Sequence, residues 1–267
     1  MNHLNDHTLA PPSLTSTVHT LGGFRLTLNG VPVEHWKGGL TKALFQHLLS
    51  NLERPVSRTA LIEALWGESS ATKPAAGLKV AVHTLRQLFT EAPPAGPDDP
   101  RLWISFQDAG YALHAENLWI DVHEFEKAVT EAIRLERDGD PAAAAVRYNQ
   151  AVQLYKGPYL PESDDPWATS RRERFKNMQL QVLTRLAAHS YERGDLQEVL
   201  VSQHRMLEID PCREESYQEL MRCHALLHQP SRVQDWFATC VHQMATRLAV
   251  EPGAATRAAY HEALRTA

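Results

Sequence analysis

The stretch KPAAGLKVAVHTLRQLFT, residues 73–90, decides how the rest of the chain is interpreted. Apolar residues recur in it at helical spacing and predict one amphipathic helix whose core side carries Leu78, Val82, Leu85 and Phe89. The opposite side carries polar and basic groups, namely Lys79, His83, Thr84, Arg86 and Gln87. An apolar back with a cationic, hydrogen-bonding front is the makeup of a helix that enters the DNA major groove, although many solvated surface helices share it.

Composition limits the kind of protein that this helix can belong to. With 267 residues, 43% of them hydrophobic and 22% charged, the chain is long enough for two soluble domains of ordinary size. The formal net charge is −5, and residues 1–116 hold nine Lys/Arg against ten Asp/Glu. This balance excludes a strongly basic nucleic-acid domain, so any DNA affinity must come from a local patch.

The cysteines and the N-terminus indicate the compartment. Cys212, Cys223 and Cys240 form an odd, sparse set, which argues against a disulfide framework and favours a reducing cytoplasm. No stretch approaches the ~20 apolar residues of a membrane span, and the first residues lack the basic start and apolar run of a secretory signal. We therefore expect a cytoplasmic protein without a membrane partner and a disordered leader over residues 1–17.

The segments around residues 73–90 alternate between strand and helix patterns. Asn29-Gly30 predicts a type I′ hairpin turn, Ser57 is a good helix N-cap, and Asp108-Ala109-Gly110 predicts a second turn. The patterns predict strands and helices in the order strand 18–28, return strand 31–33, helix 41–52, helix 58–66, helix 73–90, strand 101–106 and strand 111–113. Three helices followed by a β-hairpin form a winged helix-turn-helix, whose hairpin can reach the DNA backbone beside the helix in the major groove.

Several quoted blocks also resemble a known family. The opening LGGFRLTLNG, the block VSRTALIEALW, the Leu85-Arg86 pair and the Gly110-Tyr111 pair resemble the OmpR/PhoB-type winged helix. The combination is most similar to the version in SARP/AfsR-type regulators, which join this domain to a bacterial transcriptional activation domain. The chain departs from the family pattern in its weak charge, because positions that are usually basic hold His83 and Thr84 here.

The outward residues of the 73–90 helix are the first candidates for DNA contact. Arg86 can read guanine bidentately, and either Arg86 or Lys79 can neutralise a phosphate. The resemblance places His83 and Thr84 at positions that contact bases or phosphates in the family, and Gln87 lies on the same side. The alternative for each of them is an idle, solvent-exposed side chain.

Three further candidates lie outside that helix. The resemblance implies that Trp66 packs beneath the domain with its indole N–H near a phosphate, while a purely structural core tryptophan is the alternative. Arg58 lies in the first turn of its helix, where backbone donors also favour phosphate, and a plain surface arginine is the alternative. Lys73, in the preceding loop, can contact DNA or RNA polymerase, and the sequence does not choose between them.

From Trp119 onward the pattern is all-helical. Val122, Phe125, Val129 and Ile133 define the buried face of its first helix. Gly139-Asp140 and Gly194-Asp195 each separate two helices, which is typical of degenerate tetratricopeptide-like (TPR-like) hairpins. The blocks DVHEFEKAV, GPYL and WATSRRERF also resemble the bacterial transcriptional activation domain, whereas HQPSRVQDWFATC replaces its usual Gly-rich turn. The basic run RRER, residues 171–174, is expected to be the wet face of a helix.

No catalytic or metal-binding constellation is evident. The chain lacks GxSxG, a Gly-rich phosphate loop and HExxH. His224 and His228 have the helical spacing of a zinc pair, but no second close pair completes a site. We expect no enzyme activity, no cofactor and no metal ion.

These observations predict a mainly α protein. It comprises an α+β winged helix-turn-helix domain over residues 18–116 and an all-α TPR-like domain over residues 119–267. The function expected from the resemblance is a transcriptional regulator of the activator type that binds direct repeats in double-stranded promoter DNA, contacts RNA polymerase and pairs as a homodimer on DNA. A TPR-like interaction adaptor whose winged helix does not bind DNA remains the alternative, and no effector can be identified.

Overall fold

The computed structural model describes residues 16–67, 74–92 and 101–267, so most of the predicted leader 1–17 lies outside the described residues. The chain forms two compact units. The first unit comprises the chain up to Glu124 together with Lys156–Arg172, and the second comprises Phe125–Tyr155 and Glu173–Ala267. None of the helices in the described ranges combines the length and apolar character that crossing a bilayer requires.

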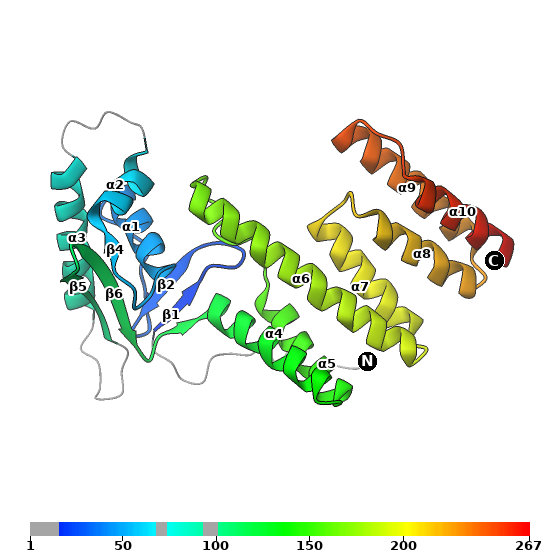
Figure 1. The fold of residues 1–267 in the computed structure, drawn as a ribbon, viewed down its shortest axis with the longest axis horizontal. Helices are drawn as coiled ribbons and strands as arrows, with labels where there is room; N and C mark the ends of the chain where they lie inside the picture. The colour runs from blue at the N-terminus through cyan, green and yellow to red at the C-terminus, as the bar shows by residue number, and fades with distance from the viewer. Residues whose placement is uncertain (1–15, 68–73, 93–100) are drawn as a thin grey trace. The chain divides into compact units, whose positions relative to one another are not determined.

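A small sheet opens the first unit (Figure 1). Its strand order is β3-β2-β1-β7, with bounds Thr17–His19 (β1), Arg25–Leu28 (β2), Val31–Pro32 (β3) and Trp119–Ile120 (β7). Asn29 and Gly30 have φ angles of 49° and 79°, so the predicted type I′ turn between β2 and β3 is confirmed. β7 pairs in parallel with β1, which brings residues 119–120 back to the beginning of the fold.

Three helices follow, with bounds Gly39–Leu49 (α1), Arg58–Trp66 (α2) and Pro74–Glu91 (α3). The predicted bounds of α2 are confirmed, because the Ser57 hydroxyl accepts a hydrogen bond from the Ala60 amide at 3.2 Å as an N-cap. The helices share a core of side chains that are almost completely buried: Leu44, Phe45, Leu48, Leu61, Leu78, Val82 and Leu85. Phe89 is half-buried and packs edge-on against Phe45. The predicted apolar face of α3 is therefore confirmed.

A second sheet, with strand order β4-β6-β5, forms the wing. Its strands are Val56–Ser57 (β4), Arg101–Gln107 (β5) and Gly110–Glu116 (β6). β5 and β6 are antiparallel, with Ile104 opposite Leu113, and they are longer than the sequence pattern predicts. Gly110 allows β4 to approach, since a Cβ atom there would lie 2.3 Å from the Val56 carbonyl oxygen.

The first unit extends beyond the predicted boundary at residue 116. The carboxylate of Asp121, which is 2% exposed, accepts hydrogen bonds from the amides of Thr20 and Leu21 at 2.7 and 2.9 Å. The Gly22 amide donates to the Pro158 carbonyl, and an isolated bridge pairs Leu21 with Tyr159. These contacts join residues 100 to 138 positions apart, which local sequence patterns do not indicate.

The prediction that RRER is a wet helix face is wrong for its first two arginines, Arg171 and Arg172. Arg172 donates hydrogen bonds to the carbonyl oxygens of Tyr159, Leu160 and Ser163 at 2.9, 2.6 and 2.5 Å. Arg171 donates to the Ser50 carbonyl at the end of α1. Both guanidinium groups satisfy carbonyls that no helix or strand partners, so their role within the first unit is structural.

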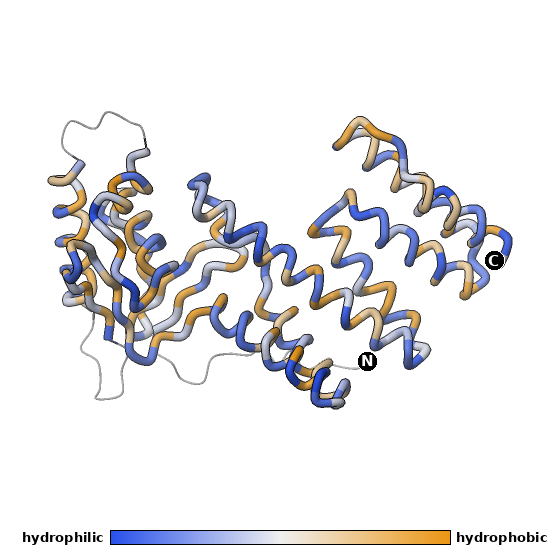
Figure 2. The backbone as a smooth tube through the Cα atoms, in the orientation of Figure 1, coloured by the Kyte–Doolittle hydropathy of each residue, from blue (hydrophilic) through white to orange (hydrophobic). Residues whose placement is uncertain are grey.

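The second unit is built from helices (Figure 1). Their bounds are Asp121–Arg137 (α4), Pro141–Leu154 (α5), Pro166–Glu192 (α6), Leu196–Ile209 (α7), Glu214–Leu226 (α8), Pro230–Leu248 (α9) and Ala254–Thr266 (α10). Figure 2 shows hydrophobic and hydrophilic residues alternating along them, as amphipathic packing requires. On α4 the predicted face is wrong at Ile133, which is 45% exposed, because the buried stripe turns to Ala128 and Ala132 instead.

The same turn separates successive helices of this unit. Gly139 and Gly194 have φ angles of 85° and 73°, and the following Asp140 and Asp195 carboxylates accept from backbone amides as N-caps. After α8 the same backbone hydrogen bonds recur at His228, whose φ is 56°. A TPR-like repeat is thus present. In the segment HQPSRV, His228 adopts the left-handed backbone conformation that Gly139 and Gly194 adopt in the other two turns.

Candidate nucleic-acid interface

The outward face of α3 carries a continuous exposed stripe. Lys79, Val80, His83, Arg86 and Gln87 are all exposed, whereas the intervening positions contribute to the core. The spacing of three and four residues places these side chains on neighbouring turns of one helix face. This stripe can present an ammonium group, an imidazole, an amide and an apolar branched side chain to a groove.

Thr84 is more constrained than the sequence suggests. Its side chain is half-buried, and its hydroxyl donates a hydrogen bond to the Val80 carbonyl at 3.0 Å. The hydroxyl proton is therefore engaged within the helix, although the oxygen retains acceptor capacity. Lys73, the remaining candidate near this helix, lies outside the described residues.

Arg86 connects α3 to the wing. Its Nε and Nη2 atoms both donate to the Ile104 carbonyl oxygen of β5, at 3.2 and 2.8 Å. β5 is an edge strand of its sheet, so this carbonyl lies on the side that no strand pairs. The helix wheel correctly predicts that Arg86 points away from the core, but the guanidinium holds a backbone oxygen within the domain.

Trp66 and Arg58 both contact the elements that would face DNA. Trp66 is half-buried, and its ring packs so close to Gly77 of α3 that a Cβ atom there would lie 2.8 Å from the indole. The exposed Arg58 guanidinium lies 5.7 Å from the centre of the Phe106 ring on β5. Both residues thus fix the relative positions of α2, α3 and the wing.

Sequence reasoning missed three exposed apolar residues, one on α3 and two on opposite faces of β5. Val80 is 65% exposed in the middle of the α3 stripe, and Trp103 and Phe106 on β5 are 41% and 53% exposed. Valine methyl groups can contact a thymine methyl, and exposed rings on a wing can pack against sugars. The helical spacing of Lys79 and His83 already indicated Val80, whereas the strand alternation on β5 left its exposed face undetermined.

A hydrogen-bonded chain of side chains holds the base of the wing. His114 of β6 lies 2.9 Å from the Ser105 hydroxyl through Nε2 and 2.5 Å from a Glu53 carboxylate oxygen through Nδ1. The other carboxylate oxygen of Glu53 accepts from the Ala115 amide at 3.0 Å. The hydrogen bond from Ala115, then that from His114, holds the pKa of the Glu53 carboxyl below its usual range.

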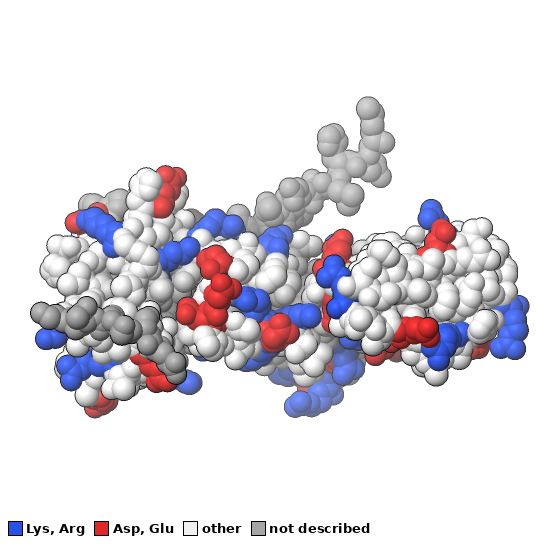
Figure 3. Space-filling model, turned by 90° about the horizontal axis from the view of Figure 1, so that it is seen from above, with Lys and Arg blue, Asp and Glu red and all other residues white. Residues whose placement is uncertain are grey.

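The charged side chains on the visible face do not form one large patch of a single sign. Figure 3 shows lysine and arginine side chains interspersed with aspartate and glutamate over the visible face. The sequence predicts the same, because residues 1–116 are nearly balanced in charge. Binding of a polyanion by this surface would depend on the geometry of α3 and the wing more than on net charge.

The histidines and cysteines of the second unit do not gather into a metal centre. Within the described ranges, no three His, Cys, Asp or Glu side chains are grouped so that they could hold a metal ion. Burial raises the pKa of the Cys223 thiol to about 11 and that of the Cys240 thiol to about 12, so both thiols are protonated at neutral pH.

Two family models match the chain. The model described as "Bacterial transcriptional activator domain" matches residues 120–264, more than half of the 267 residues. The model described as "Transcriptional regulatory protein, C terminal" matches residues 40–113, which include α1, α2, α3 and most of the wing.

Individual proteins with similar sequences include regulators from Mycobacterium tuberculosis and Streptomyces griseus. The transcriptional regulatory protein MoaR1 of Mycobacterium tuberculosis is 27% identical over 255 residues, which cover 92% of this chain and 78% of MoaR1. The regulatory protein AfsR of Streptomyces griseus is 26% identical over 179 residues, 64% of this chain but 17% of AfsR. Among solved structures, Mycobacterium tuberculosis EmbR in complex with a low affinity phosphopeptide has the same fold, with a TM-score of 0.72 and 22% identity, over 94% of this chain and 65% of that one.

Proposed function

The chain belongs to the bacterial transcriptional activator domain family of transcriptional regulators, and from this premise we propose that it binds promoter DNA. In this proposal α3 enters the major groove and the β5–β6 hairpin contacts the flanking backbone or minor groove. The observation that carries the proposal is the exposed stripe of Lys79, Val80, His83 and Gln87 on the helix that the fold presents beside its wing.

Within this stripe each group has a distinct part. Lys79 neutralises a phosphate, Gln87 and His83 hydrogen-bond to base edges, and Val80 contacts a thymine methyl. Arg86 sets the position of the wing relative to α3 through the Ile104 carbonyl, and this position determines how many phosphates the wing reaches. Thr84, Trp66, Arg58 and Lys73 complete the proposed interface, with Trp66 and Arg58 supporting it through Gly77 and Phe106.

The second unit is assigned to protein contacts. We infer that its TPR-like helices contact RNA polymerase and pair two copies on direct repeats, so that the protein activates transcription in the cytoplasm. The family to which residues 120–264 belong supports this assignment, because its name describes an activator domain. No catalytic step is part of the proposal.

The test measures binding of the full chain to duplex DNA from its own upstream region as salt is varied. We expect log Kd to change linearly with log salt concentration, because basic side chains of the protein displace the counterions bound to the DNA phosphates. Lys79→Ala should weaken binding to all duplexes by a similar factor and reduce the salt slope by about 1. Gln87→Ala should instead weaken binding to the preferred duplex by about 1–3 kcal/mol and relax its sequence preference.

The matched control is Lys127→Ala on α4, which removes the same charge from another exposed position. It should leave both the affinity and the salt slope unchanged. If the Lys79 and Lys127 variants behave alike, α3 is not the DNA-binding helix. If the chain binds no duplex at low salt, the adaptor interpretation replaces the proposal.

A further inference from the structure

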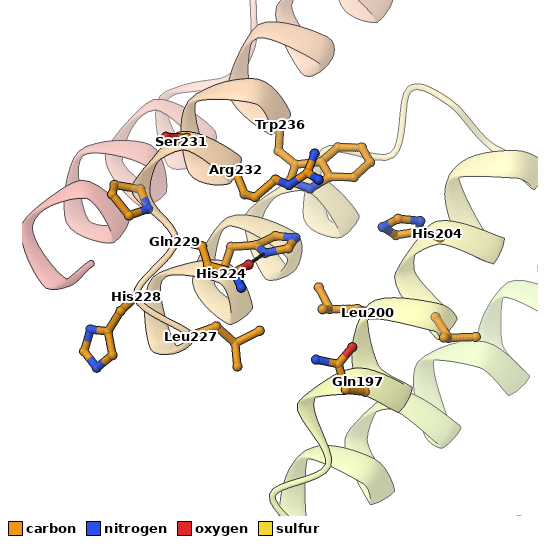
Figure 4. Close-up of a pocket in the computed structure, with 12 residues that line it drawn as sticks. Gln197, Leu200, His204, His224, Leu227, His228, Gln229, Ser231, Arg232 and Trp236 are labelled. Atoms are coloured by element: carbon orange, nitrogen blue, oxygen red, sulfur yellow. Dashed lines mark hydrogen bonds between the residues drawn. The ribbon is translucent and has the colours of Figure 1, made fainter.

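An open pocket in the second unit has no part in DNA binding. It lies between α7, the end of α8 and the beginning of α9, and its volume is about 760 Å³, within the range of small-molecule sites (Figure 4). Its wall combines apolar surface from Leu200, Leu227 and Trp236 with several nitrogen-containing side chains. This mixture is typical of a pocket that orients a small ligand rather than one that is only a packing defect.

The polar side chains that line the pocket are all neutral or basic. Its lining includes His204, His224, Gln229, Ser231 and Arg232, and none of the lining side chains, all within the described ranges, is a carboxylate. The first turn of α9 contains no acidic residue, and Gln229 provides no side-chain cap to it. The pocket is therefore suited to a negatively charged group, which the positive end of the α9 dipole would also favour.

His224 is held in a defined orientation toward this space. It is 9% exposed, and its Nδ1 atom lies 2.8 Å from the Gln229 amide oxygen, so Nδ1 donates the hydrogen bond. The Nε2 atom of this tautomer is then a hydrogen-bond acceptor. Figure 4 shows His224 and His204 projecting toward the same space from opposite sides, whereas His228 points away from it.

One wall of the pocket can accept a flat ring. The indole of Trp236 lies 5.0 Å from the imidazole of His204, between ring centres, at an angle of 67°. Leu200 and Leu227 provide aliphatic surface on the facing elements. Burial, followed by the neighbouring His224, lowers the pKa of His204, and the carboxylate of Glu208 opposes this shift.

From these observations we propose that the pocket binds a small organic anion with an aromatic ring, of the aromatic carboxylate class. The carboxylate would contact Arg232, and the ring would pack on Trp236 between the two leucines. Such a site would give the second unit a small-molecule effector function that is separate from the α3 surface.

The experiment titrates the full chain with 2-naphthoate, its uncharged analogue 2-naphthamide, and acetate, using isothermal calorimetry. We expect saturable binding of naphthoate that is at least about tenfold tighter than that of naphthamide or acetate, since only naphthoate provides both the ring and the charge. Arg232→Gln should weaken naphthoate binding by about tenfold and leave naphthamide binding unchanged.

The control is Arg193→Gln, because the two arginines are closely matched. Arg232 is 66% exposed and lies 3.8 Å from Asp235, and Arg193 is 65% exposed and lies 3.9 Å from Asp195. Both variants should fold, and Arg193→Gln should bind naphthoate like the wild type. The proposal is overturned if naphthoate shows no saturable binding, if naphthamide binds equally well, or if both arginine variants bind naphthoate with the same affinity.

Discussion

Replacing Arg86 by alanine tests whether this residue positions the wing. Arg86 donates two hydrogen bonds to the Ile104 carbonyl oxygen of the edge strand β5. Alanine removes both hydrogen bonds. The structure therefore predicts a loss of stability that a freely solvated arginine would not produce.

The size of this loss follows from the exposure of both partners. A hydrogen bond to a charged group contributes about 1.5–3 kcal/mol when it is shielded from water. Arg86 is exposed, and water can reach the Ile104 carbonyl at the sheet edge after the substitution. We therefore expect a cost of about 1 kcal/mol, which corresponds to a decrease in Tm of roughly 3 °C for a protein of this size.

The assay measures Tm and DNA affinity on the same preparations of Arg86→Ala, Arg86→Lys and the neighbouring control Gln87→Ala. If Arg86 positions the wing, Arg86→Lys should lose most of the same stability, because an ammonium group cannot reproduce the two-pronged contact. Gln87→Ala should melt like the wild type. An Arg86→Ala variant that melts like the wild type would refute the reasoning, and an affinity retained by Arg86→Lys alone would identify a phosphate contact by charge instead.

The other predictions concern a strained turn, two thiols and a carboxylate. His228→Gly should stabilise the protein by about 0.5–1 kcal/mol, because glycine adopts a φ of 56° without the cost that a Cβ atom imposes. Thermal melting measures the change in stability, and a Tm below that of the wild type would contradict the prediction. When the native protein is treated with iodoacetamide at pH 8, the half-buried Cys212 should be alkylated well before Cys223 and Cys240, because those two thiols are buried and have raised pKa values. Peptide mass spectrometry measures the order of alkylation, and early labelling of Cys223 and Cys240 would contradict their packing. Hydrogen bonds from β6 lower the folded-state pKa of Glu53, so its contribution to stability is present above the unfolded value of about 4.3 and is lost as pH falls through the folded value. The Tm difference between wild type and Glu53→Gln should shrink from pH 6 to pH 3, and a difference that grows on acidification would show that the sign is wrong.

Local sequence signals were sufficient to predict those elements whose conformation is determined by residues adjacent in the chain. The bounds of α2 could be predicted because Ser57 caps its first turn and Gly67 follows its last residue. The turn at Asn29-Gly30 and the repeated turns at Gly139 and Gly194 could be predicted for the same reason. In each case one or two residue types dictate the backbone conformation.

Features that depend on distant residues could not be predicted. The first unit includes Lys156–Arg172 because the Gly22 amide donates to the Pro158 carbonyl and Arg171 donates to the Ser50 carbonyl, and both contacts join residues far apart in sequence. Ile133 follows the helical period from Val129, but the packing of α4 places Ala132 on the buried side. A helix wheel gives the direction of Arg86, whereas only the position of β5 determines what its guanidinium contacts.

Selection of DNA ligands from a random duplex library tests the central claim most directly. The full chain and a variant with Lys79, His83 and Gln87 all replaced by alanine are carried through the same rounds, since these outward side chains are not needed for the core. We predict that the wild type enriches one motif and that the variant enriches nothing above the starting library. Enrichment of the same motif by the variant would show that α3 does not read DNA.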